Sequence, residues 1–175
     1  MADTGFIGYL INETDPIFTL IKELHQVLKA ILKDRFDPQI YPHTTLVYLG
    51  DKYDTCQKIE EDAFFTDRIT KLRNCICKFE RLDMIGRSLV LVYNFFDSTL
   101  GSVVSDLTKK YEHHRPAKNL HITIGSLSPI AYHWFNEERR RFFEEKLGNF
   151  AFIMSSPQVI RVSAQDKSYH LVKAF

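Results

Sequence analysis

The sequence lacks the features that mark secreted, membrane-spanning and disulfide-stabilised proteins. It has three cysteines, Cys56, Cys75 and Cys77, and their odd number and spacing match no disulfide framework, which predicts a reducing compartment. No stretch approaches the ~18 uninterrupted apolar residues of a membrane span. The acidic start, Met1–Gly5, does not resemble a signal peptide. We therefore expect a soluble, cytoplasmic protein that has no membrane partner.

The chain also lacks an excess of charge of either sign. It has 23 Lys and Arg residues and 22 Asp and Glu residues, which give a formal net charge of +1. Binding of a long nucleic acid requires a basic surface, and we expect none here. A few well-placed donors can still hold a small anionic ligand. The 14 Phe and 8 Tyr residues provide aromatic surface for core packing or base stacking.

No Gly-, Ser- or Pro-rich linker divides the chain, and we expect a single domain over residues 1–175. Alternating apolar residues predict strands, and apolar residues at helical spacing predict helices. The predicted strands are 6–11, 42–50, 75–82, 88–93, 120–125, 149–154, 158–163 and 169–172. The predicted helices are 15–34, 97–112 and 132–147, with one or two short helices between 54 and 72 and a loop over 36–41.

A strand-helix-strand unit occurs twice, and each time its second strand carries a His-x-Thr motif. Residues two apart in a strand point to the same face. His43 therefore shares a face with Thr45, and His121 shares one with Thr123, whereas strict alternation puts Tyr48 opposite His43. We expect the two motif strands to meet across a cleft.

Two such pairs are suited to cleaving a phosphodiester. Imidazole titrates near neutrality, so one histidine can take a proton from the attacking hydroxyl or water while the other gives a proton to the leaving oxygen. Each role contributes roughly 100- to 10,000-fold in rate. The threonine hydroxyls can donate to the non-bridging oxygens, where negative charge builds up. The catalytic candidates are His43, Thr45, His121 and Thr123, and the mechanism needs no metal ion or other cofactor.

With these two motifs, each following a strand and a helix, the chain resembles the 2H phosphoesterase superfamily. That group includes LigT-like 2′,3′-cyclic phosphodiesterases and viral 2′,5′-phosphodiesterases. Its pattern is His, any residue, Thr or Ser, then an apolar residue, and both His43–Leu46 and His121–Ile124 match it. The resemblance covers essentially the whole chain. It implies an α+β, bilobal fold of two antiparallel sheets with outer helices around a central cleft, related by a pseudo-twofold internal repeat.

The resemblance also implies a metal-independent phosphodiesterase that acts on 2′-linked or cyclic nucleotide phosphates. Substrates within the superfamily include 2′,5′-oligoadenylate, 2′,3′-cyclic phosphate RNA ends, and cyclic di- or oligonucleotide messengers such as cyclic GMP-AMP. The near-neutral chain favours a small nucleotide or short oligonucleotide as its partner, and we expect a monomer. Small enzymes of this type in viruses and phages remove nucleotide messengers of host immunity, and the resemblance extends that role to this chain.

Three further residues are candidates for substrate binding. Tyr169, in the last predicted strand, is placed to stack on a base or to touch the phosphate, as aromatic residues do in the proteins that this chain resembles. Arg115 and Lys118 lie in the basic loop before the second motif, where they can face a phosphate. The alternatives are core packing for Tyr169 and solvation for the two cations.

Four other interpretations of the motifs remain open. Each histidine can be a hydrogen-bonded structural residue at a strand edge. A zinc site would find ligands of the right type in Cys75, Cys77, His113 and His114, but the spacing of these residues matches no zinc motif. The same site can hold a nucleotide or RNA end without turnover. It can also process RNA ends as a 2′,3′-cyclic phosphodiesterase.

Overall fold

A computed structural model of the chain describes residues 3–50, 58–59, 61–111, 120–166 and 168–171. Its helices are α1 (Pro16–Leu32), α3 (Ala63–Lys71), α4 (Leu100–Tyr111) and α5 (Glu137–Leu147). Its strands are β1 (Thr4–Leu10), β2 (Phe36–Pro38), β3 (His43–Gly50), β4 (Cys75–Ile85), β5 (Ser88–Phe95), β6 (His121–Leu127), β7 (Ala151–Met154), β8 (Gln158–Val162) and β9 (Tyr169–Leu171). None of the helices in these described ranges is long and apolar enough to cross a membrane.

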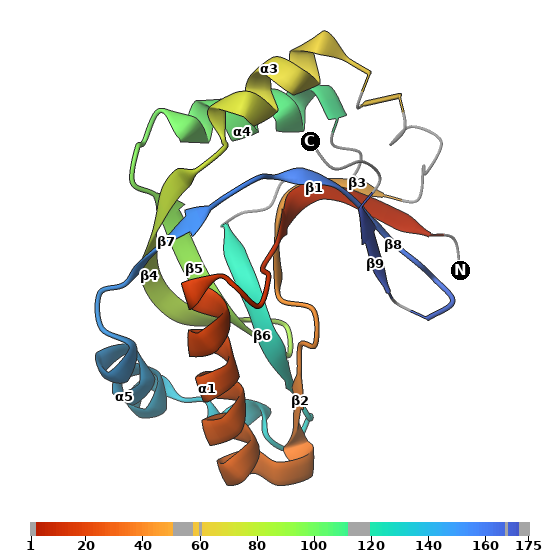
Figure 1. The fold of residues 1–175 in the computed structure, drawn as a ribbon. Helices are drawn as coiled ribbons and strands as arrows, with labels where there is room; N and C mark the ends of the chain where they lie inside the picture. The colour runs from red at the N-terminus through yellow and green to blue at the C-terminus, as the bar shows by residue number, and fades with distance from the viewer. Residues whose placement is uncertain (1–2, 51–57, 60, 112–119, 167, 172–175) are drawn as a thin grey trace.

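The strands form a curled antiparallel sheet with the two motif strands at its centre. Over the described residues its order is β7-β4-β5-β6-β3-β1-β8-β9, and β2 also pairs with β6. The two halves of the sheet meet where Thr44 of β3 pairs with Ile122 of β6. Figure 1 shows α3 and α4 beside each other at one end of the molecule and α1 and α5 at the other. The predicted α+β fold class is confirmed, with one continuous antiparallel sheet in place of the two that were predicted.

The first helix forms as its sequence predicts. Asp15 occupies the N-cap position, Pro16 begins α1, and the buried positions recur at helical spacing. The Asp15 carboxylate does not cap the helix. It accepts hydrogen bonds from the Tyr9 hydroxyl at 2.5 Å and the Asn12 N–H at 2.7 Å. This acidic side chain therefore ties the end of β1 to the start of α1.

Two other segments differ from their predicted structure. The predicted loop over 36–41 contains β2, because this segment pairs with β6 and the Phe36 side chain is buried. The predicted helix over 132–147 begins only at Glu137, where the Asn136 side chain accepts a hydrogen bond from a backbone N–H of the first turn. Both differences depend on contacts that apolar spacing does not reveal.

The two motif strands carry a β-bulge at the same place. In each, one extra apolar residue follows the motif threonine: Leu46 in β3 and Ile124 in β6. In β3, Thr45 pairs with Gly8 and Val47 pairs with the adjacent Ile7, so Leu46 is the extra residue. In β6, Thr123 pairs with Val90 and Gly125 pairs with the adjacent Leu89, so Ile124 is the extra residue. A bulge bends its strand and re-aims nearby side chains, and bulges are common beside active sites. The predicted internal repeat therefore extends to a one-residue irregularity in each half.

The bulge in β3 corrects the prediction for Tyr48. Strict alternation places Tyr48 opposite His43, but the extra residue reverses the alternation. Tyr48 lies across from Phe6, whose ring centroid is 5.0 Å from that of His43. Because cross-strand partners share a face, Tyr48 lies on the same face as His43.

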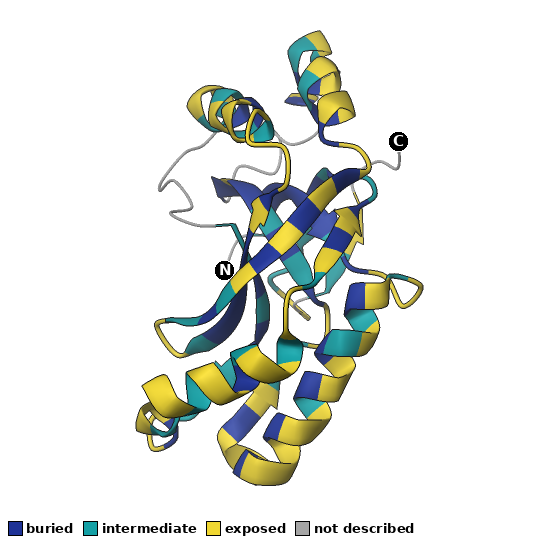
Figure 2. Ribbon diagram, turned by 90° about the vertical axis from the view of Figure 1, so that its left-hand side faces the viewer, coloured by how far each residue is buried: buried dark blue, intermediate teal, exposed yellow. Residues whose placement is uncertain are grey.

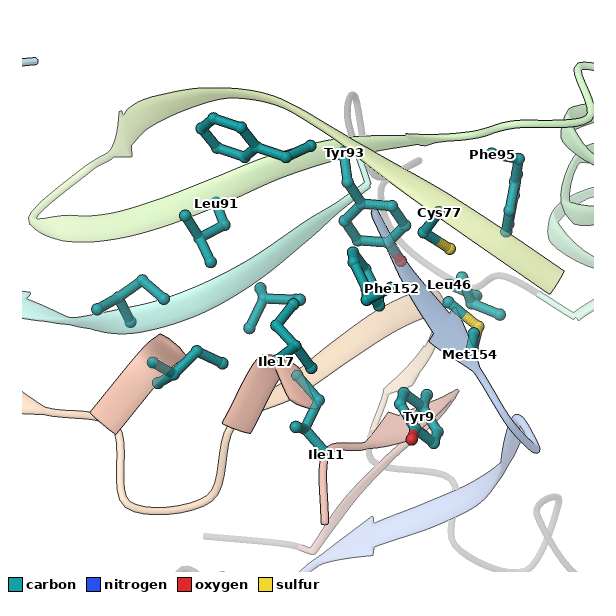
Figure 3. Close-up of a cluster of buried hydrophobic side chains, with 14 of the residues drawn as sticks. Tyr9, Ile11, Ile17, Leu46, Cys77, Leu91, Tyr93, Phe95, Phe152 and Met154 are labelled. Carbon is teal, nitrogen blue, oxygen red and sulfur yellow. The ribbon is translucent and has the colours of Figure 1, made fainter. Parts of the chain in front are cut away.

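One cluster of buried side chains contains residues from all four described helices and from both halves of the sheet. Figure 3 shows part of it, with Ile17 of α1, Leu46 of β3, Tyr93 of β5 and Phe152 of β7. Buried and exposed positions alternate along part of the sheet (Figure 2), as in the first half of β4, whereas β1 and β5 are buried along most of their length. Cys77 of β4 is fully buried in this cluster. The helices thus cover one face of the sheet, and the other face is left for the motif side chains.

Candidate active site

The pairing of β3 with β6 brings the two motifs together. Their middle residues, Thr44 and Ile122, lie directly across from each other. Continued by one residue each way, this antiparallel register puts each motif histidine across from the threonine of the other motif. Such partners have Cβ atoms roughly 4.5–5.5 Å apart, and diagonal partners, here the two histidines, roughly 7–8 Å. His43, Thr45, His121 and Thr123 therefore lie on one face of the sheet, around the single β3–β6 pair.

The middle residues point the other way, into the core. Thr44 and Ile122 are both fully buried, whereas the motif histidines and threonines are partly exposed. The Thr44 hydroxyl shares a hydrogen bond of 2.5 Å with the Tyr93 hydroxyl, and burial raises the pKa of Tyr93 well above its usual value. The structure thus separates the two adjacent threonines of the first motif. Thr44 is a core residue, and Thr45 faces the candidate site.

The imidazole of His43 is held in one tautomer. Its Nδ1 lies 2.9 Å from the Tyr41 carbonyl oxygen. A carbonyl can only accept a hydrogen bond, so Nδ1 carries the hydrogen and Nε2 of the neutral ring carries the lone pair. The ring centroid lies 4.8 Å from that of Tyr169 and 5.0 Å from that of Phe6. His43 is therefore arranged to accept a proton at Nε2.

Burial also favours the neutral form of His43. It lowers the pKa of His43 below 6.5, and the nearby charge of His121 lowers it further, while the Tyr41 carbonyl bond raises it. The electrostatic effect of His121 agrees with the β3–β6 register, which places both rings on one face. His121 itself lies across from Val92 of β5.

Close packing fixes the strand next to Thr45. Gly8 of β1 lies across from Thr45, and a Cβ on Gly8 would be 2.0 Å from the Thr44 carbonyl oxygen. The neighbouring Phe6 ring would also be too close, at 2.8 Å. Only glycine therefore allows β1 to approach the first motif at this distance.

Tyr169 lies against His43. Burial raises the pKa of the Tyr169 hydroxyl, and the hydroxyl accepts a hydrogen bond from Gln39 Nε2 at 3.3 Å. The Tyr41 ring lies 5.5 Å from the Tyr169 ring, and 51% of Tyr41 is exposed. Whether Tyr169 binds a base stays a prediction.

Sequence reasoning missed Gln39 and Phe6 as residues of this site. Gln39 falls in a predicted loop, and its contact with Tyr169 spans 130 positions, so no local pattern reveals it. Phe6 was predicted only as the first residue of a strand over 6–11. Arg115 and Lys118 lie outside the described residues, and their phosphate-binding role stays a prediction.

The fold is similar to that of two solved structures. The PDE domain of ns2 from MHV superimposes with a TM-score of 0.59 over 91% of this chain and 99% of its own, at 16% identity. Usb1 from Kluyveromyces marxianus, solved with uridine monophosphate, gives a TM-score of 0.51 over 97% of this chain and 98% of its own, at 12% identity. No family model and no curated protein sequence matches the chain. At these identities the two similarities show the fold of the chain.

Proposed function

We propose that the chain is a metal-independent phosphodiesterase that cleaves a 2′-linked or cyclic nucleotide phosphodiester. The observation that carries the proposal is the β3–β6 register, which sets the two motif histidines and threonines on one face. The similarity to the MHV ns2 PDE domain supports the same class of reaction. A binding protein would not need two proton-transfer groups in matched positions.

His43 is the general base for attack from its side. Its Nε2 takes the proton of the attacking water or sugar hydroxyl as the oxygen-to-phosphorus bond forms. His121 gives its proton to the leaving oxygen as the other phosphorus–oxygen bond breaks. Exchange with solvent then resets both rings. The lowered pKa of His43 and its bond to the Tyr41 carbonyl support this assignment, because both keep Nε2 available as an acceptor.

Thr45 and Thr123 donate to the non-bridging oxygens of the phosphate. Negative charge on these oxygens grows in the transition state, so the two hydroxyls stabilise it more than they stabilise the ground state. The substrate is a small nucleotide: 2′,5′-oligoadenylate, a cyclic dinucleotide such as cyclic GMP-AMP, or a 2′,3′-cyclic nucleotide. Removal of such an immune messenger for a virus or phage is the corresponding biological role.

The test is incubation of the protein with these three substrate classes in the presence of EDTA, followed by separation of the products. We expect wild type to cleave at least one class, and His43→Ala and His121→Ala each to lose activity while remaining folded. Thr44→Val is the matched control, because Thr44 faces the core. Full activity in both histidine variants would refute the proposal. Tight binding without any product would favour the non-catalytic binding module.

A short RNA end is the second candidate substrate. Usb1, which has a similar fold, was solved with uridine monophosphate. A uridine-ended oligonucleotide therefore belongs in the same panel, with either a free or a cyclic phosphate end. Preferential cleavage of this substrate would assign the chain to RNA-end processing.

A further inference from the structure

Gln39 contacts the second motif strand through its backbone and both neighbours of the His43 ring through its side chain. From these contacts we infer that Gln39 is a positioning residue, which holds the imidazole of His43 in its base tautomer and ties it to the second motif. The inference rests on the proposed function for its consequence in catalysis. Its structural part, the tautomer of His43, stands by itself.

The side chain of Gln39 holds both neighbours of the His43 ring. Its Nε2 donates to the Tyr41 carbonyl oxygen at 3.2 Å and to the Tyr169 hydroxyl at 3.3 Å. That same carbonyl accepts from His43 Nδ1 at 2.9 Å, and the Tyr169 ring lies 4.8 Å from the His43 ring. The Gln39 amide therefore fixes the Tyr41 carbonyl, which selects the tautomer of His43. It also fixes the Tyr169 ring, which shields the imidazole from water.

The backbone of Gln39 bonds to the second motif strand. Its N–H donates to the Ile124 carbonyl oxygen at 2.8 Å. Ile124 is the extra residue of the β6 bulge, directly after Thr123. The same carbonyl lies 2.7 Å from His25 Nε2 of α1. The backbone of Gln39 is thus bonded to the centre of the sheet, and its side chain holds His43 in place relative to that centre.

This arrangement predicts that two variants change His43 in opposite directions. Gln39→Leu removes the donor and frees the Tyr41 carbonyl. Because the carbonyl bond raises the pKa of His43, loosening it lowers that pKa further. Gln39→Glu keeps the shape but adds a negative charge, which raises the pKa of His43. Among the described residues, the titratable groups facing His43 are His121 of β6, Tyr169 of β9 and Tyr41. Both substitutions remove the bond from Gln39 to the Tyr169 hydroxyl, but burial raises the pKa of Tyr169, so Tyr169 stays neutral while His43 titrates.

The test follows the His43 ring by nitrogen-detected NMR as a function of pH, in wild type and in both variants. We expect wild type to hold the hydrogen on Nδ1, and Gln39→Leu to populate both tautomers. We expect the titration of His43 to move to lower pH in Gln39→Leu and to higher pH in Gln39→Glu. Gln26→Leu, at an exposed position of α1, is the matched control and should titrate as wild type does.

Activity supplies the second measurement. A slight misplacement of a catalytic group lowers kcat by about 10- to 100-fold. We expect that loss in both Gln39 variants, with KM changed less than kcat and with the acid limb of the pH–rate profile shifted as in the NMR titration. An unchanged His43 tautomer and titration in both variants would overturn the inference, even if activity fell. The NMR result does not require turnover, so it also distinguishes failure of this inference from failure of the proposed function.

Discussion

Replacing Thr44 by Val should weaken the fold without impairing catalysis. The Thr44 hydroxyl and the Tyr93 hydroxyl lie 2.5 Å apart, and both residues are buried. Valine keeps the shape of the side chain but leaves the Tyr93 hydroxyl in the core without this partner. An unsatisfied buried hydroxyl costs about 1–3 kcal/mol. For a chain of this size that loss lowers the melting temperature by about 2–12 °C.

The double variant Thr44→Val with Tyr93→Phe separates this effect from loss of packing. It removes both hydroxyls, so no polar group of the pair remains buried, and replacing both partners by apolar groups of the same shape can be nearly neutral. The destabilisation should therefore be smaller than the sum of the two single variants, with a coupling energy of about 0.5–3 kcal/mol.

Urea unfolding of the four proteins measures this coupling energy, and kcat on the cleaved substrate measures catalysis. We expect kcat to stay within about twofold of wild type, because Thr44 points away from the site and its loss moves no catalytic group. Additive destabilisation would show that the hydroxyl pair does not act as a unit. A large loss of activity in Thr44→Val with little loss of stability would refute the assignment of Thr44 to the core.

Three further predictions concern a glycine of β1, the ring that covers His43, and the two buried histidines. Gly8→Ala should destabilise the protein by about 1–3 kcal/mol or more in urea unfolding, because its Cβ would press on the backbone of β3. Gly101→Ala, at a helical position with open space around it, should stabilise by at most about 1 kcal/mol; equal effects would contradict the packing argument. Tyr169→Ala should expose the His43 ring and move its NMR titration toward 6.5, whereas Tyr169→Phe should move it less. Burial lowers the pKa of both His25 and His43 below 6.5, so the free energy of unfolding should fall as the pH drops from about 6.5. A His25→Gln variant whose free energy of unfolding depends on pH as steeply as that of wild type would argue against this.

The sequence predicts the two motifs well because the evidence for them is local. A histidine and a threonine two positions apart in a strand must share a face, and the residue between them must take the other. The preceding helices follow from apolar spacing in the same way, as α1 does. The strand-helix-strand unit then repeats, which indicates related halves. These features depend only on neighbours within one segment.

Local sequence patterns do not predict how separate segments pair with each other. The apolar bulge residues, Leu46 and Ile124, continue an ordinary alternating pattern, and only pairing with β1 and β5 reveals that each is an extra residue. For that reason Tyr48 was assigned to the wrong face. Gln39 follows Pro38 in what reads as a loop, and its role depends on the pairing of β2 with β6. Long-range register therefore determines the part of the site that local patterns do not predict.

In the proposed reaction, two histidines share the proton transfers without a metal ion. The most direct test is the pH dependence of kcat/KM for the cleaved substrate in EDTA, over about pH 5 to 9. We predict a bell-shaped profile. Its acid limb falls below pH 6.5 as His43 becomes protonated and can no longer act as a base. Its basic limb falls as the general acid loses its proton. A flat profile, or loss of all activity in EDTA, would contradict the account.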